Sequence, residues 1–144
     1  MRHQIELQIR WADLDALNHV NNVRLMEFLQ DARVDLFARG LPVDELTGLA
    51  RDGNSDAGFV IARQAVDYLA QIFLTDRRLS IETTVRRLGR SSVTMQQIVR
   101  NPNGVSVAQA EIVLVCIDRA SSDSRELPET WRAFFTEYLE EQMA

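Results

Sequence analysis

The sequence predicts an α+β fold, in which one antiparallel sheet packs around one long helix and a further helix follows near the C-terminus. The chain opens with an alternating polar and apolar segment, and a long apolar helical pattern comes after it. Four more strand-like segments follow, and tight turns separate the last three of them. Because short turns join antiparallel neighbours, the sheet should be antiparallel. We expect one domain over residues 1–144, since this length supports a single core.

Hydrophobic periodicity predicts the first strand and the long helix. In residues 4–10 the apolar side chains occupy every second position, which is typical of a half-buried strand. In residues 22–39 the apolar positions cover more than one face, so we expect a mostly enclosed helix. Asn21 and Asn22 are suitable N-caps, and Gly40 is a typical stop signal.

The later strands are predicted from the same alternation and from turn chemistry. They are expected at residues 59–73, 79–88, 91–100 and 105–118. The first of them should bend near Leu69, and turns are expected at Gly89 and at the Asn-Gly pair Asn103-Gly104. Residues 42–58 are expected to form a flap with a short helix around residues 44–50.

The end of the chain should form an amphipathic helix that Pro128 opens. Its aromatic residues recur at helical spacing, and we expect them to pack against the domain. They are Trp131, Phe134, Phe135 and Tyr138.

Composition excludes several classes of partner and location. A net charge of −5 gives no basic field for nucleic acid or an anionic membrane surface. There is neither a signal-type apolar region nor an apolar run long enough to span a membrane, so we expect a cytoplasmic protein. The single cysteine, Cys116, lies in an apolar run and should be a buried hydrophobe without a disulfide partner in its chain.

The candidate site is the polar loop of residues 10–23, between the first strand and the long helix. It holds the carboxylates of Asp13 and Asp15, the imidazole of His19 and three side-chain amides. Loops in this position often carry function. Asp15 should lie one short loop away from the unpaired N–H groups of the helix start, an end that stabilises negative charge.

Other kinds of chemistry have less support. The Gly-x-Ser-x-Gly motif of serine hydrolases is absent, and so is any glycine-rich phosphate loop. Asp13, Asp15 and His19 could gather around a metal, but no His-x-x-x-His motif or cysteine pair accompanies them. We therefore expect neither a metal nor another cofactor.

The loop also carries a family resemblance. Arg10-Trp11-Ala12-Asp13-Leu14-Asp15, followed by His19-Val20-Asn21-Asn22, resembles the active-site signature of hotdog-fold acyl-CoA thioesterases of the 4-hydroxybenzoyl-CoA thioesterase type, which include bacterial long-chain acyl-CoA thioesterases. The similar segments beyond the loop are residues 27–33, 79–83, 89–92, 115–118 and 127–128. The resemblance implies a hotdog fold, with a curved sheet wrapped around the long helix, and hydrolysis of an acyl-CoA to the free acid and coenzyme A.

The resemblance also implies roles for individual residues. Asp15 corresponds to the catalytic carboxylate, which acts as nucleophile or as general base. The backbone N–H of Asn22 corresponds to the group that polarises the thioester oxygen. Asp13 is expected to tie the loop down through Arg10 or backbone N–H groups, and His19 and Asn18 to shape the loop. Leu17-Asn18 stands where relatives often place a glycine before the histidine.

A basic hairpin is the candidate for holding the phosphates of coenzyme A. It consists of Arg86, Arg87, Arg90, Ser91 and Ser92. The alternative interpretation is an ordinary solvated turn, and Arg77 and Arg78 are weaker candidates.

Other functions and the assembly stay open from sequence alone. A non-catalytic acyl-CoA or acyl-carrier-protein binding module of the same fold is the alternative function. A hotdog dehydratase has less support, because its histidine motifs are absent. An open sheet edge and the resemblance both predict a homodimer, or a tetramer of dimers, with the acyl site at a subunit boundary.

Overall fold

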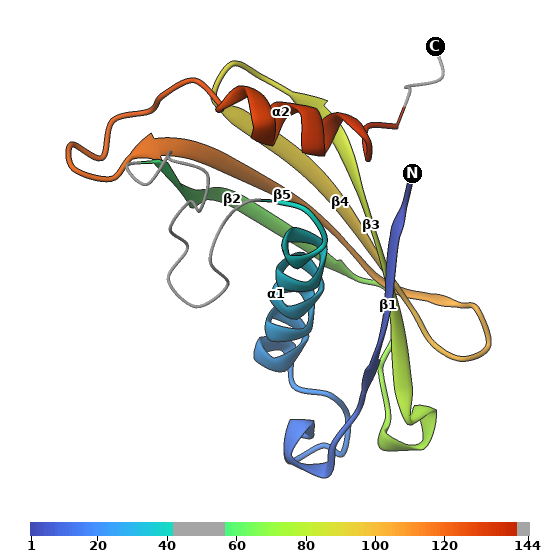
Figure 1. The fold of residues 1–144 in the computed structure, drawn as a ribbon. Coiled ribbons are helices and arrows are strands. Elements are labelled where there is room, and N and C mark those ends of the chain that lie inside the picture. The colour runs from blue at the N-terminus through green and yellow to red at the C-terminus, as the bar shows by residue number, and fades with distance from the viewer. Residues whose placement is uncertain (42–56, 141–144) are drawn as a thin grey trace.

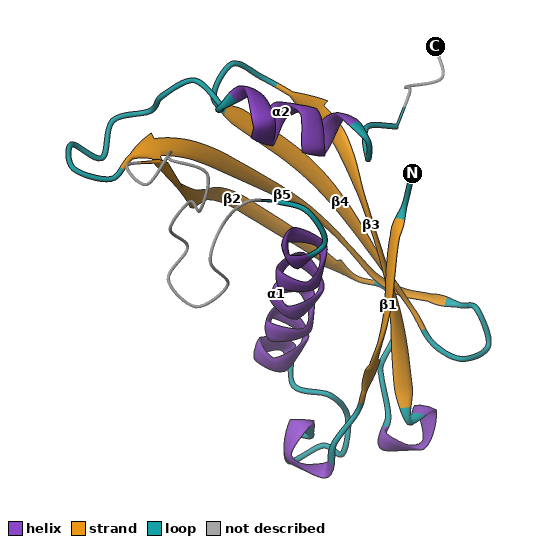
Figure 2. Ribbon diagram, viewed as in Figure 1, coloured by secondary structure: helices purple, strands orange, loops and turns teal. Residues whose placement is uncertain are grey.

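The computed structural model describes residues 1–41 and 57–140. It contains a five-stranded antiparallel sheet in the order β1-β3-β4-β5-β2, with two helices (Figure 1, Figure 2). The elements are β1 (His3–Gln8), α1 (Asn22–Ala38), β2 (Ala57–Tyr68), β3 (Arg78–Leu88), β4 (Ser92–Arg100), β5 (Ser106–Asp118) and α2 (Glu129–Thr136). Short 3-10 helices lie at Trp11–Asp13 and Leu74–Asp76. The predicted α+β class and antiparallel sheet are confirmed.

The edge strand β2 is shorter than the sequence suggested. The expected strand reached residue 73, but β2 ends at Tyr68. Ile72 lies beyond the strand and contacts the polar loop, where its carbonyl accepts a hydrogen bond from the Val20 N–H at 2.7 Å. A bulge between Ile61 and Arg63 also shifts the pairing of β2 with β5. A bulge exchanges the faces of the side chains that follow it, which the alternation of single residues does not reveal.

Both faces of β3 are largely covered. Leu79, Ile81 and Val85 are fully buried on the core face, as expected. On the opposite face Glu82 is only 6% exposed. Its carboxylate accepts hydrogen bonds from Arg2, Gln4 and Arg100, which stand on or next to the neighbouring strands. These donors compensate the buried charge, as a buried carboxylate requires.

The helix α1 begins where the sequence predicted. The side chain of Asn21 caps it by accepting the Val23 N–H at 2.7 Å. The helix is less enclosed than expected, because Val23 is 66% exposed. The buried face of the helix also includes a charged residue, Arg33, which is only 5% exposed.

A polar tie fastens α1 to the middle of the sheet. Arg33 donates to the Gln97 side-chain oxygen at 3.0 Å, and the Gln97 amide donates to the Leu29 carbonyl at 3.0 Å. Burial lowers the pKa of the Arg33 guanidinium to about 10. Sequence reasoning did not predict this contact.

The C-terminal helix α2 packs on the sheet through its aromatic side chains, as predicted. Pro128 is its N-cap, and Trp131 and Phe135 are fully buried. The ring of Phe59 in β2 lies 5.0 Å from that of Trp131, and Phe37 of α1 lies 6.0 Å from Phe135, so both helices share one aromatic cluster on the same side of the sheet. Cys116 is buried, as expected.

Two further expectations concern the flap and membranes. The flap expected over residues 42–58, with its short helix, lies outside the described residues except for its last two positions, Ala57 and Gly58, which belong to β2. No helix in the described part of the chain has the length and apolar character needed to cross a membrane.

Candidate active site

The polar loop is pinned at the end of the sheet where β1 finishes and β3 starts (Figure 1). The Ile9 N–H donates to the Arg77 carbonyl at 2.8 Å, just before the loop. Within the loop, His19 forms an isolated bridge with Phe73. The segment between β2 and β3 therefore contacts the chain both just before the loop and inside it.

Asp13 ties the loop down, as the sequence predicted. Its carboxylate is fully buried and accepts the Arg10 N–H at 2.7 Å and the Arg10 guanidinium at 3.2 Å. The structure adds a third partner, Arg24 in the first turn of α1, at 3.6 Å. Asp13 is thus turned toward two arginines, and no group of three His, Cys, Asp or Glu side chains able to hold a metal occurs among residues 1–41 and 57–140.

Asp15 is partly exposed, with one oxygen held by the loop. Its Oδ1 accepts the Leu17 N–H at 2.9 Å, while Oδ2 lies 3.4 Å from Nδ1 of His19. The turn also depends on Asn18, which has a φ of 63° in the left-handed region. Asparagine tolerates this region better than most residues, so Asn18 can take this conformation at low cost.

The start of α1 offers a backbone donor beside this turn. The Val23 N–H is satisfied by Asn21, but no described residue accepts a hydrogen bond from the Asn22 N–H. The first N–H groups of a helix carry partial positive charge. They suit an oxygen on which negative charge develops.

A hollow of about 360 Å³ opens next to this donor. His19 and Asn22 line it on one side, and Tyr68 and Leu69 at the end of β2 line it on the other. Asp15 is not a lining residue and borders the hollow through His19. The arrangement gives a mixed polar and apolar cavity beside a carboxylate and a helix end.

The basic hairpin lies at the opposite end of β3 from the polar loop (Figure 1). At about 3.3 Å per residue, the length of β3 separates them by roughly 30 Å. The hairpin residues are also divided among themselves. Arg86 and Arg87 line a hollow on the outer face of the sheet, whereas Arg90, Ser91 and Ser92 form the turn before and at the start of β4.

The turn itself is ordered by a cation from α2. Arg132 donates to the carbonyl oxygens of Gly89 and Arg90 at 2.9 and 3.0 Å. These bonds hold the backbone and leave the Arg90 side chain exposed. One chain therefore does not bring the hairpin and Asp15 together.

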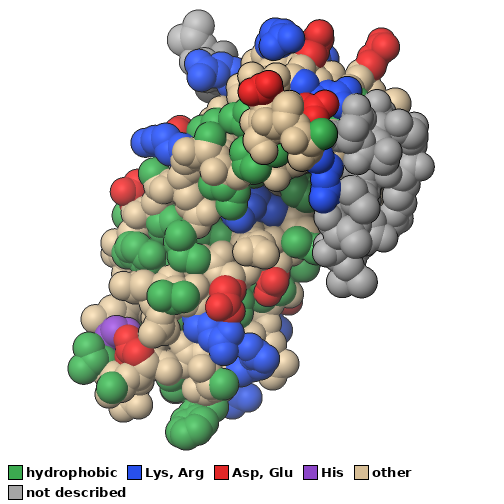
Figure 3. Space-filling view, turned by 90° about the vertical axis from the view of Figure 1, so that its left-hand side faces the viewer, with side chains coloured by type: hydrophobic (Ala, Val, Ile, Leu, Met, Phe, Trp, Pro, Cys, Tyr) green, Lys and Arg blue, Asp and Glu red, His purple; other side chains and the backbone are tan. Residues whose placement is uncertain are grey.

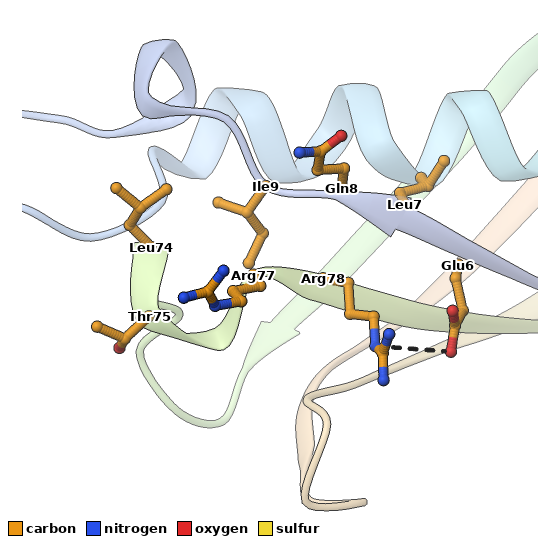
Figure 4. A pocket seen from close by; sticks show the side chains of 8 residues that line it. All are labelled: Glu6, Leu7, Gln8, Ile9, Leu74, Thr75, Arg77 and Arg78. Carbon is orange, nitrogen blue, oxygen red and sulfur yellow. Dashed lines mark ion pairs between the residues drawn. The ribbon is translucent and has the colours of Figure 1, made fainter.

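Besides Arg10 and Arg24, the cations Arg77 and Arg78 lie at the loop end of the sheet. They line an open groove with Ile9 and Leu74 (Figure 4). Arg78 lies 3.9 Å from the Glu6 carboxylate, a weak ion pair between exposed side chains. From the sequence these two arginines were weaker candidates than the hairpin, but they lie closer to the polar loop along the sheet.

The edge of β2 carries exposed apolar side chains. Val60 and Ile61 are 44% and 50% exposed, and Tyr68 and Leu69 are 49% and 53% exposed. Figure 3 shows a group of hydrophobic side chains on the face that it presents. Within the described chain β2 pairs on one side only, with β5. An apolar open edge of this kind favours a partner strand.

Known proteins with similar sequences or folds include several thioesterases. The long-chain acyl-CoA thioesterase FadM of Escherichia coli K12 is 33% identical over 116 residues, which cover 80% of this chain and 83% of FadM. A thioesterase of Thermus thermophilus, solved in complex with coenzyme A and Zn, has a TM-score of 0.76 at 34% identity, with 92% of this chain and 95% of that chain covered.

A more distant structure shares the fold. The 1,4-dihydroxy-2-naphthoyl-CoA thioesterase of Synechocystis has a TM-score of 0.83 at 16% identity and covers 95% of this chain and 97% of its own. The five-stranded antiparallel sheet with two helices is consistent with a hotdog fold. The sequence profile of the thioesterase-like superfamily matches residues 9–135. This match spans the polar loop, the whole of α1 and the later strands, and the chain therefore belongs to the thioesterase-like superfamily.

Proposed function

We propose that this protein is an acyl-CoA thioesterase, which hydrolyses an acyl-CoA to the free acid and coenzyme A in a single hotdog domain over residues 1–144. The observation that carries the proposal is a set of features at one end of the sheet: the carboxylate of Asp15 in contact with His19, the hollow that His19 and Asn22 line, and an Asn22 N–H for which no described residue is the acceptor. The names of its relatives, long-chain acyl-CoA thioesterase and acyl-CoA thioester hydrolase, support the same reaction.

In the proposed mechanism the thioester oxygen accepts a hydrogen bond from the Asn22 N–H. Attack on the carbonyl carbon moves negative charge onto this oxygen, and the helix end stabilises the charge better in the transition state than in the ground state. A donor in this role contributes about 3–4 kcal/mol. The C–S bond then breaks, and coenzyme A leaves as a thiolate that takes up a proton.

Asp15 supplies the attack in one of two ways. As a general base it takes a proton from water, whose oxygen forms the new C–O bond. As a nucleophile it forms an acyl-aspartyl anhydride, which water then hydrolyses. A single turnover in ¹⁸O water tests for the nucleophilic route, because unlabelled product acid in the first turnover requires the oxygen to come from Asp15. His19 holds the turn that presents Oδ2, as its 3.4 Å contact suggests.

A dimer would complete the site. Pairing two β2 edges antiparallel about a twofold axis places the hairpin end of one subunit toward the Asp15 end of the other. We propose that Arg86, Arg87, Arg90, Ser91 and Ser92 of the neighbouring subunit meet the phosphates of coenzyme A. Within one chain the hairpin and Asp15 are about 30 Å apart along β3, so one chain could not bind the phosphates and the thioester of the same substrate without a large movement. In the dimer the neighbouring subunit supplies the hairpin, and no such movement is needed.

The test is hydrolysis of a panel of acyl-CoAs that vary in chain length and aromatic character, with released thiol as the readout. Wild-type protein should release coenzyme A from part of the panel, and Asp15→Asn should not. Binding of acyl-CoA by wild type without thiol release would support the alternative, a non-catalytic binding module.

A further inference from the structure

The side chain of Gln64 in β2 makes an unusual contact with α1. Its amide N–H donates to the sulfur of Met26 at 2.9 Å, and both side chains are partly buried. A thioether is a weak acceptor. No described residue donates a hydrogen bond to the side-chain oxygen of Gln64, Oε1. Among the described residues the amide N–H therefore has only a weak acceptor, and an oxygen placed beside it would form the stronger hydrogen bond.

Gln64 lies in line with the hollow at the start of α1. Side chains two residues apart on a strand share one face, so Gln64, Val66 and Tyr68 form a row on the side of β2 that faces α1. Tyr68 at the end of this row lines the hollow. On the helix, Met26 follows Asn22 by four residues, which is about 6 Å along the axis.

The residues of β5 that stand opposite this row are smaller near the hollow than at Gln64. In the pairing of β2 with β5, Tyr68 stands opposite Ala108 and Val66 opposite Ala110. Gln64 stands opposite the larger Ile112. An acyl group that starts at Asn22 and follows the helix would pass small apolar side chains and then meet the Gln64 amide.

We propose that Gln64 is a specificity-determining residue, which selects acyl groups that carry a hydroxyl or keto oxygen a few bonds beyond the thioester carbonyl. The inference rests on the proposed thioesterase function and on an acyl group lying along α1. An oxygen at this depth replaces sulfur as the partner of the Gln64 amide. A saturated chain leaves the amide N–H with sulfur only and removes water from the side-chain oxygen, which costs binding energy.

The experiment measures kcat/KM for decanoyl-CoA and for its 3-, 4- and 5-hydroxy derivatives. In wild type we expect at least one hydroxylated substrate to exceed decanoyl-CoA by about tenfold, the ratio for one hydrogen bond of about 1.4 kcal/mol. Gln64→Met, which keeps the length of the side chain, should reduce this ratio to about one.

Two further variants separate specificity from structure. Met26→Leu removes only the sulfur acceptor, so it should keep or increase the preference, whereas a purely structural bond would make it behave like Gln64→Met. Gln109→Met changes the same kind of side chain on the opposite face of the sheet and should keep the wild-type ratio.

The outcomes separate this inference from the proposed function. Hydrolysis of all substrates at similar kcat/KM in wild type, or an unchanged preference in Gln64→Met, overturns the role of Gln64 and leaves the thioesterase intact. Absence of hydrolysis with every acyl-CoA overturns the proposed function, and the inference with it.

Discussion

Nδ1 of His19 lies 3.4 Å from Oδ2 of Asp15, across a turn that needs Asn18 in the left-handed region. The other oxygen of Asp15 is engaged by the Leu17 N–H. The turn thus fixes one carboxylate oxygen and directs the second toward the imidazole. Any reaction at Asp15 depends on this local geometry, which the first prediction tests.

Replacing Asp15 with Asn should lower kcat by about 100-fold or more, since an amide is neither a base nor a nucleophile. The fold should persist, because Asp15 is partly exposed and the Asn oxygen can still accept the Leu17 N–H. Thermal unfolding and turnover should be measured on the same sample. His19→Gln is the matched comparison, with a smaller loss expected from a residue that shapes the loop. A parallel loss of stability and activity in Asp15→Asn would make the carboxylate structural.

Arg90→Ala should raise KM for acyl-CoA several-fold and change kcat little. A phosphate contact far from the carbonyl contributes equally in the ground and transition states. An exposed cation is screened by salt, so about 1 kcal/mol, or roughly fivefold, is the ceiling for one residue. A short thioester without the nucleotide is the internal control, because it offers no phosphate. Equal effects on both substrates, or none, would mean that coenzyme A is held elsewhere, and Arg77→Ala then becomes the next variant to measure.

The protein should be a homodimer or a tetramer in solution. Twice and four times the chain mass of 16.4 kDa give about 33 and 66 kDa. Ile61→Lys on the open edge of β2 should shift the mass toward the monomer, because a charged edge opposes strand pairing. Light scattering at micromolar concentration provides the measurement. A wild-type mass near 16.4 kDa contradicts the prediction.

Gln97→Leu should destabilise the fold by about 1.5–3 kcal/mol, because Arg33 would keep a buried charge without its amide acceptor. The double variant Arg33→Met with Gln97→Leu should recover much of this loss, since a buried polar pair replaced by apolar groups of similar size costs little. Urea unfolding of the single and double variants measures the difference. An additive loss in the double variant would show that the two side chains act independently.

The lowered pKa of Asp35 predicts that part of the stability of the fold is lost in acid. Partial burial raises the pKa of its carboxyl, but hydrogen bonds from His3 and Arg39 outweigh this, and the pKa lies below its usual 3.8. A carboxylate with a lowered pKa in the folded state stabilises the fold above the unfolded pKa, and the contribution disappears as the pH falls through the folded value. Asp35→Asn should therefore be less stable than wild type at neutral pH, and the gap should close below about pH 4. Unfolding midpoints from about pH 3 to 7 test this, and a constant gap contradicts it.

The sequence by itself determined what depends on neighbours along the chain. The alternation around Ile81 predicted a strand, Asn21 predicted the cap of α1, and Gly104 takes the positive φ of its turn. The place of Asp15 one loop before the helix start follows from the same local signals. Periodicity, caps and turns involve only a few consecutive residues, so one sequence is enough to predict them.

The tertiary structure decided what depends on strand order and register. Arg33 and Gln97 are 64 residues apart, and nothing in either local pattern distinguishes a buried arginine from a solvated one. The burial of Glu82 depends likewise on donors from two other segments, and the distance between Arg90 and Asp15 depends on which end of β3 each occupies. Hydrophobic pattern fixes which face of an element is buried. The partner that a charged group meets there is set only when the strands have taken their places in the sheet.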